Sequence, residues 1–252
     1  MNTTRKIGNL LLAVSAGVLA VACTENEETP ELAQSEVSIV ASVGSSEADP
    51  GARTTNLVYG NFEISDIKVS LDNVKLILRG TTEGSNKPSI VQIRNNSPQL
   101  LTLIEDGVIY EPIIGTAMAY DGVYGKLDFD LVKTMEVPVD DEMYGLSVFA
   151  KASWFGIPAE VSIDLEEEVN VMFNQGVEVA GAQDLYLTLY LDKFLEGVDP
   201  NLVSDGNGDG LVEVGPDNVD GNGEAYEAIT ANMQDAMTLK NGEFKKDKKD
   251  KS

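Results

Sequence analysis

The chain has 252 residues, a formal net charge of −24 from 42 acidic and 18 basic residues, and no histidine. A surface this negative repels phosphate backbones, which excludes nucleic acid as a partner. The lack of histidine excludes Ser-His-Asp and Cys-His catalysis, and every metal site that needs imidazole.

Residues 1–22 have the pattern of an export signal. Arg5 and Lys6 form a short positive region, an apolar run covers residues 10–22, and Cys23 follows. This pattern is typical of a secretory signal peptide. The run is shorter than the roughly 20 residues that a membrane-spanning helix needs. Residues 19–23, Leu-Ala-Val-Ala-Cys, resemble a bacterial lipobox, which implies cleavage before Cys23 and lipidation of its thiol.

Cys23 is the only cysteine in the chain, so no internal disulfide can form. An ordinary signal peptide followed by a chance cysteine is the alternative interpretation. Lipidation predicts that acyl chains on Cys23 hold the protein at a membrane. We expect a cell-envelope location at the outer membrane, on its periplasmic or surface side. Residues 23–35 are predicted to be a flexible acidic tether, and residues 241–252 a lysine-rich disordered tail.

Between residues 36 and 240 the dominant hydrophobic period is two, which indicates half-buried strands. A change of phase at Asp72 and Asn73 predicts a bulge or tight turn inside one strand. Residues 122–125, Gly-Val-Tyr-Gly, predict a turn. The strands are expected at residues 37–43, 62–71, 74–78, 90–93, 100–104, 127–131, 146–152, 159–165, 169–173 and 185–191.

Many short strands separated by Gly, Asn and Asp turns predict a mainly β fold, an antiparallel β-sandwich. Residues 193–198 predict a short helical turn. Residues 224–239 carry Tyr226, Ile229, Met233 and Met237 at helical spacing, which predicts a C-terminal amphipathic helix packed on the sandwich.

The segment 205–213, Asp-Gly-Asn-Gly-Asp-Gly-Leu-Val-Glu, has the donor spacing of a calcium loop. Asp205, Asn207 and Asp209 place oxygen-bearing side chains at every second position. Calcium takes six to eight oxygen ligands, so the Leu211 carbonyl and Glu213 are predicted to add to this set. The segment resembles the first half of an EF-hand or dockerin loop, and this resemblance implies bound calcium.

The loop departs from that resemblance at its closing position. Pro216 stands where a bidentate acid is expected, and Asp217 or Asp220 is left to complete the shell. An exposed turn has the same Asp, Asn and Gly composition, so a plain turn stays the alternative. If calcium binds, we expect it to stabilise the junction between sandwich and helix rather than to catalyse.

Two other features could form a binding or catalytic site. Trp154 and Phe155 could stack on a sugar, although a lone tryptophan next to a strand is more often core packing. The acidic triplets 140–142 and 166–168 could hold the acid and base of a glycan hydrolase. Such triplets are usually solvated turns, and adjacent residues on one strand point to opposite faces.

Residues 67–76, 122–129 and 189–199 carry a wider resemblance. Together they resemble an uncharacterised bacterial lipoprotein family whose shared domain has no assigned function. The sequence departs from the family at Phe194 and Leu195, where a Trp-Phe pair is more usual. The resemblance covers residues 36–240 and implies a lipidated β-domain facing the periplasm or the exterior. It implies no reaction.

The sequence therefore favours a membrane-anchored, non-enzymatic lipoprotein that works as a binding or interaction module and is stabilised by calcium. Its expected partners are the membrane, through Cys23, and a glycan or an envelope protein. A carboxylate-based glycan hydrolase and a structural component of an envelope assembly are the two alternatives.

Overall fold

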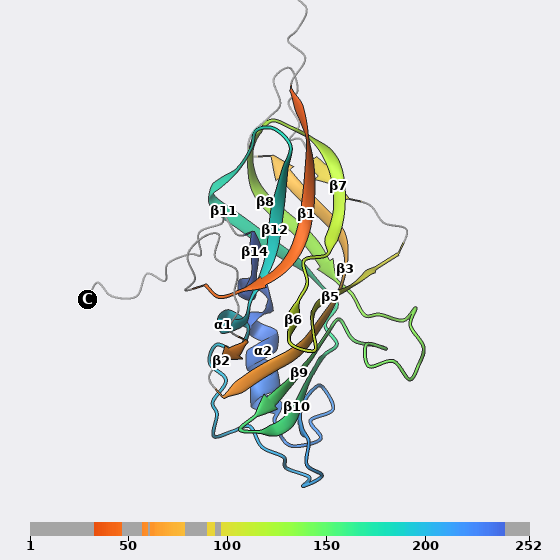
Figure 1. Cartoon of the computed structure of the whole chain (residues 1–252), viewed down its shortest axis with the longest axis vertical. Helices are drawn as coiled ribbons and strands as arrows, with labels where there is room; N and C mark the ends of the chain where they lie inside the picture. The colour runs from red at the N-terminus through yellow and green to blue at the C-terminus, as the bar shows by residue number, and fades with distance from the viewer. Residues whose placement is uncertain (1–32, 47–56, 60, 79–89, 94–96, 240–252) are drawn as a thin grey trace, which may run out of the picture. The chain divides into compact units, whose positions relative to one another are not determined.

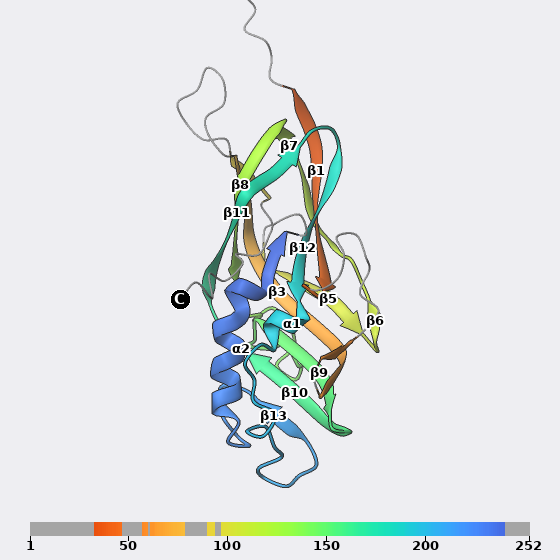
Figure 2. The same cartoon turned by 90° about the vertical axis from the view of Figure 1, so that its left-hand side faces the viewer.

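The structure, a computed structural model, describes residues 33–46, 57–59, 61–78, 90–93 and 97–239. Within these residues the chain forms two β-sheets and two helices (Figures 1 and 2). The signal segment, Cys23, nearly all of the tether and the lysine-rich tail lie outside the described residues, so what the sequence predicts of them stays a prediction.

The first sheet has four strands in the order β14-β12-β1-β7. Their bounds are Gln34–Gly44 for β1, Ile113–Tyr120 for β7, Gln183–Tyr190 for β12 and Met237–Leu239 for β14. β1 runs parallel to β12 and antiparallel to β7. Sequence periodicity did not predict β7, because apolar residues stand next to one another in it and hide the period of two.

The second sheet has ten strands, with the main order β11-β8-β3-β9-β10-β13. β3 is the longest, Phe62–Leu78, and pairs with β9 along its first half and with β8 along its second. The other strands are β2 Val58–Tyr59, β4 Ile90–Gln92, β5 Gln99–Glu105, β6 Val108–Ile109, β8 Gly122–Leu131, β9 Val148–Trp154, β10 Ile157–Ile163, β11 Glu167–Val179 and β13 Val212–Val214.

The turn predicted at residues 122–125 is wrong. These residues begin β8, where Tyr124 lies opposite Val177 of β11 and Leu78 of β3. Pairing of Gly122 with Val179 and of Tyr124 with both neighbouring strands holds this segment in an extended strand that local turn propensity would not favour. Tyr124 is fully buried there, and its hydroxyl donates to the carbonyl of Tyr120 at 3.0 Å.

The predicted change of phase inside β3 is confirmed. The register with β8 shifts between Asp72 and Lys75, and Asn73 has a φ of 54°. Asparagine tolerates this left-handed conformation better than most residues. Its Nδ2 also donates to Asp130 Oδ2 at 2.8 Å. The bulge turns both Leu71 and Val74 into the core, although they are three residues apart.

The two sheets share one hydrophobic core, which contains Ile39 and Leu187 from the first sheet and Leu76 and Phe129 from the second. The mainly β prediction with sandwich-like sheets is therefore confirmed. The sheets are mixed rather than purely antiparallel, because the β1–β12 and β10–β13 pairs run parallel. A parallel pair needs a long crossover, which local periodicity does not reveal.

The predicted C-terminal helix is confirmed as α2, Gly223–Ala236, but it is shorter than the pattern indicated. It buries one apolar face, formed by Ala225, Ile229, Met233 and Ala236. Residues 237–239 leave the helix and form β14, which pairs antiparallel with β12. The predicted helical turn is α1, Leu191–Phe194, and starts two residues early.

Candidate functional site

The calcium-type segment belongs to a longer loop between α1 and α2, residues 205–222, which we call the acidic loop. It lies at the opposite end of the β-domain from the first residues of β1 (Figures 1 and 2). β13 runs through it and pairs in parallel with β10, so the loop is joined to the second sheet by backbone hydrogen bonds. This pairing gives the loop a fixed attachment to the fold.

Asp205 organises the first turn of the acidic loop. Its Oδ1 accepts the N–H of Gly208 at 2.7 Å and of Asp209 at 3.1 Å, and its Oδ2 accepts the N–H of Gly210 at 2.9 Å. Asp209 Oδ1 in turn accepts the N–H of Leu211 at 2.9 Å. The alternating oxygen-bearing side chains thus curl the backbone tightly, as the spacing predicted. Asp and Asn side chains stabilise turns in this way whether or not an ion is present.

Asp220 closes the loop from its far end. Its Oδ1 accepts the N–H of Asn207 at 3.1 Å and its Oδ2 accepts the N–H of Glu213 at 2.7 Å. The residue is only 7 % exposed. Of the two acids left open by the sequence, Asp220 is therefore the one drawn into the predicted segment. A carboxylate oxygen has two lone pairs, so these bonds do not exhaust its capacity to accept.

Asn222 was missed by sequence reasoning. It precedes α2, but its side chain does not cap the helix. Instead, its Oδ1 accepts the N–H of Ser204 at 3.0 Å, and its Nδ2 donates to the carbonyls of Ser204 at 2.9 Å and Glu213 at 2.8 Å. The side chain is nearly fully buried and ties Ser204 and Glu213, on either side of the predicted calcium segment, to the start of α2. The sequence signal was an asparagine directly before a helix, which reads as an ordinary cap.

The acidic loop concentrates negative charge, and its own sequence supplies no cation. Between Lys193 and Lys240 the sequence contains no lysine or arginine. Burial raises the pKa of Glu213 above its ordinary value, and repulsion from Asp209, Asp220, Glu160 and Asp205 raises it further. The acids contributed by the loop and by β10 thus oppose ionisation of Glu213. A cation bound among them would relieve this repulsion.

The predicted ligand set contains only oxygen donors, the chemistry that calcium prefers. Among the residues that the structure describes, however, no three carboxylates, thiolates or imidazoles converge into a group that could hold a metal ion. Asp205, Asp209 and Asp220 instead accept backbone N–H groups. Calcium binding therefore stays a prediction from spacing and donor type.

The raised pKa of Glu213 predicts a pH dependence of folding in the absence of metal. The folded state holds the Glu213 proton more tightly than the unfolded state, so protonation favours folding. This stability is present below the ordinary value of 4.5 and is lost as the pH rises through the folded-state pKa. We expect Glu213→Gln to remove this loss and to raise the melting temperature in EDTA at neutral pH.

Calorimetric melts of wild type and variant in EDTA between pH 4 and pH 8 measure this difference. Glu227→Gln is the matched control, because it removes the same charge from an exposed position on α2. If the Glu213→Gln protein melts at or below the wild-type temperature at neutral pH, the ionised Glu213 carboxylate does not destabilise the folded state.

Trp154 and Phe155 occupy opposite environments. Trp154 is 4 % exposed and packs on Phe62 with ring centroids 4.2 Å apart, so it belongs to the core. Phe155 is 68 % exposed and touches the Trp154 ring edge-on at 4.9 Å. The tryptophan cannot serve as a sugar-stacking platform in this arrangement. Only the phenylalanine ring is accessible.

The first acidic triplet contains a carboxylate that is held ionised. Glu142 accepts hydrogen bonds from Lys68 Nζ at 2.7 Å and Lys151 Nζ at 2.5 Å. Burial alone would raise the pKa of Glu142, but the bonds from Lys151 and Lys68 outweigh it and lower the pKa below its ordinary value. A general acid for glycoside cleavage needs a raised pKa. Glu142 is therefore poorly suited to that role.

Among the described residues, no helix has the length and apolar character required to cross a membrane. Comparison of the chain with protein-family models, with curated proteins and with solved structures finds no match.

Proposed function

We propose that the chain is a lipid-anchored, non-enzymatic binding module of the bacterial cell envelope, in which calcium stabilises the acidic loop. The observation that carries the proposal is the position of Cys23, the single cysteine, directly after an apolar segment with a positive start. The acyl chains hold the protein at the membrane, and two lipid chains are enough for stable anchoring.

The arrangement of the β-domain supports a role in binding. β1 begins at Gln34, so the short segment 24–33 is all that separates the anchor from the domain. The acidic loop and the β9–β10 hairpin lie at the other end of the domain from this starting point (Figures 1 and 2). The end of the domain that carries these two features is thus not the end that the tether joins. In this role calcium would hold the loop in shape and would take part in no reaction.

The calcium ligands in this proposal come from the residues predicted for the acidic loop. Asp205, Asn207 and Asp209 would supply side-chain oxygens, Leu211 its carbonyl, and Glu213 a carboxylate. Asp220 supports the site by holding the backbone at both ends of the predicted segment. A bound ion would draw the carboxylates together, and their repulsion would no longer oppose folding.

Lipidation is tested by the Cys23→Ser variant. We expect the wild-type chain, expressed in a bacterial host with an alkyne-labelled fatty acid, to carry the label and to sediment with membranes. The variant should lose the label completely and leave the membrane fraction, because serine offers no thiol for acyl transfer. Thr24→Ser is the control, since it changes the neighbouring residue and keeps the thiol. Label retained by Cys23→Ser would refute the anchor.

A further inference from the structure

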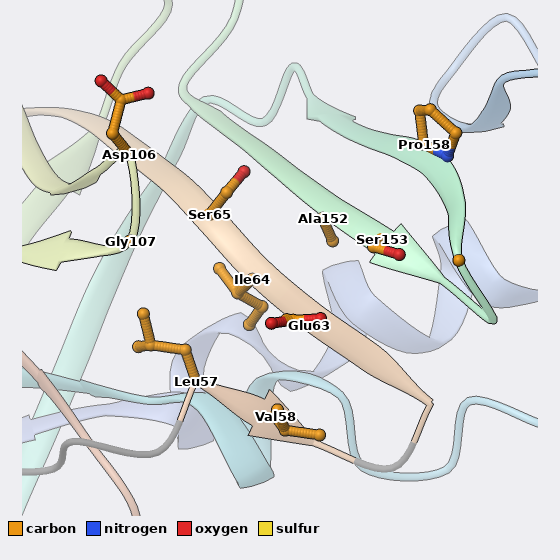
Figure 3. Close-up of a pocket in the computed structure, with 11 residues that line it drawn as sticks. Leu57, Val58, Glu63, Ile64, Ser65, Asp106, Gly107, Ala152, Ser153 and Pro158 are labelled. Carbon is orange, nitrogen blue, oxygen red and sulfur yellow. The ribbon is translucent and has the colours of Figure 1, made fainter.

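An open hollow of about 660 Å³ lies on the second sheet, beside β2 and the β9–β10 hairpin (Figure 3). A row of side chains crosses four strands within it: Val58 lies opposite Glu63, Glu63 opposite Ser153, and Ser153 opposite Pro158. Directly opposed residues share one face of a sheet, so these four form a continuous surface. Asp106, from the turn between β5 and β6, stands at the opposite end of the hollow from Pro158 (Figure 3).

The hollow carries negative charge only. Among the described residues that line it, Glu63 and Asp106 are the charged ones, and none is a lysine or an arginine. Within the part of the chain that the structure describes, neither carboxylate takes part in a salt bridge. Lys68 on β3 and Lys151 on β9 both bind Glu142. Among the described residues the two carboxylates thus have no cationic partner, and they can attract a cation.

Phe155 directly precedes Gly156, which lines the hollow, and its ring contacts the ring of Trp154. Phe155 and Gly156 form the turn between β9 and β10, with φ values of 48° and 85°. Two-residue hairpin turns with both φ values positive favour Asn-Gly, because a bulky side chain is strained in this region. Phe155 is also mostly exposed, so packing in the core does not account for it. Its ring face can accept an ammonium or guanidinium group through a cation–π interaction.

We propose that this hollow binds an extended, arginine- or lysine-rich peptide segment of a partner protein. Glu63 and Asp106 accept charge-assisted hydrogen bonds from two basic side chains, and a third basic side chain lies over the Phe155 ring. Charge complementarity favours this partner over a neutral glycan, because a glycan would leave two carboxylates without a counter-charge. The inference rests on the proposed function and names the partner class for that binding module.

Trp154 supplies the readout, because it is the only tryptophan in the chain and its ring touches Phe155. The lipidated full-length protein in detergent micelles is titrated with a nonapeptide of alternating arginine and serine, and tryptophan emission is followed at low and high salt. The same peptide with citrulline in place of arginine is the uncharged probe. The variants are Glu63→Gln, Asp106→Asn and Phe155→Asn, with Glu178→Gln as the control that removes an exposed charge from β11.

We expect salt-sensitive binding of the arginine peptide and none of the citrulline peptide. Glu63→Gln and Asp106→Asn should each weaken binding by about tenfold, the effect of losing one charge-assisted hydrogen bond. Phe155→Asn should weaken peptide binding, because the aromatic ring is lost. It should also raise the melting temperature, because asparagine suits the positive φ of the turn, so weaker binding could not be attributed to loss of folding. Glu178→Gln should bind as wild type. Equal affinity in all four variants would overturn the inference, since it would mean attraction by net charge alone.

A neutral oligosaccharide that changes Trp154 emission, when the arginine peptide does not, would also overturn the inference and would leave the proposed binding module standing. Absence of peptide binding in a protein that still carries the lipid label on Cys23 would overturn the partner class and leave the anchor intact.

Discussion

Millimolar calcium is expected to raise the melting temperature of the full chain by about 5–10 °C over its value in excess EDTA. Binding at 100 times the dissociation constant adds about 2.7 kcal/mol, and each kcal/mol corresponds to roughly 2–4 °C for a chain of this size. The physical source of the gain is the acidic loop and the adjacent β10. Burial raises the pKa of Glu213, repulsion from Asp209, Asp220, Glu160 and Asp205 raises it further, and no base lies between Lys193 and Lys240 in the sequence.

Differential scanning calorimetry with calcium, with magnesium and with EDTA measures this shift. Asp205→Asn and Asp209→Asn should both abolish the calcium effect, because each loses a charge that binds the ion. Asp209→Asn keeps an oxygen for the Leu211 N–H, whereas Asp205→Asn keeps only one of the two oxygens that accept backbone N–H groups. Asp235→Asn, on the exposed face of α2, is the control and should respond as wild type. If calcium shifts the wild-type protein no more than magnesium does, the acidic loop is a hydrogen-bonded turn.

Gly206→Ala is expected to destabilise the protein by about 1–3 kcal/mol, the usual cost of inserting an atom into a packed site. A Cβ atom at Gly206 would lie 2.1 Å from the carbonyl oxygen of Asp220 and 2.8 Å from its carbonyl carbon. Both are backbone atoms, so the loop backbone at Asp220 has to move. That movement would break the bonds from Asn207 and Glu213 to Asp220 and remove the calcium response as well.

The matched control for this prediction is Gly215→Ala. A Cβ atom there would lie 3.5 Å from Ser162 Cβ, which is ordinary van der Waals contact. Urea unfolding in EDTA gives the free energy of each variant. We expect Gly206→Ala to lose stability and Gly215→Ala to remain near wild type. Equal behaviour of the two variants would mean that the close approach of Gly206 to Asp220 does not organise the loop.

The spacing of residues in the sequence was sufficient to predict an element wherever the geometry of that strand or loop depends on its own residues. The alternating leucines of β12 predicted a strand with one buried face, and Leu185, Leu187 and Leu189 are all buried. The phase change in β3 predicted its bulge, because the period of two has to slip by one residue to keep both halves facing the core. The Asp-x-Asn-x-Asp-Gly spacing predicted a tightly curled turn, which needs only neighbouring side chains and backbone N–H groups.

The spacing of residues within one segment could not predict which distant segments pair with one another. Residues 237–239 continue the helical spacing of α2, yet they form β14, because β12 offers them a ladder of backbone hydrogen bonds. Trp154 and Phe155 are adjacent in sequence, but the core against Phe62 takes the tryptophan and the hairpin turn exposes the phenylalanine.

The sequence by itself thus determined the mainly β character, the β3 bulge, the C-terminal helix and the curled shape of the acidic loop, since each follows from the spacing of side chains along one short segment. The tertiary structure alone decided the parallel pairing of β1 with β12, the choice of Asp220 to close the loop, and the row from Val58 to Pro158. These features depend on which distant backbones meet, because contacts of that kind are set by packing of the whole core and leave no local periodicity.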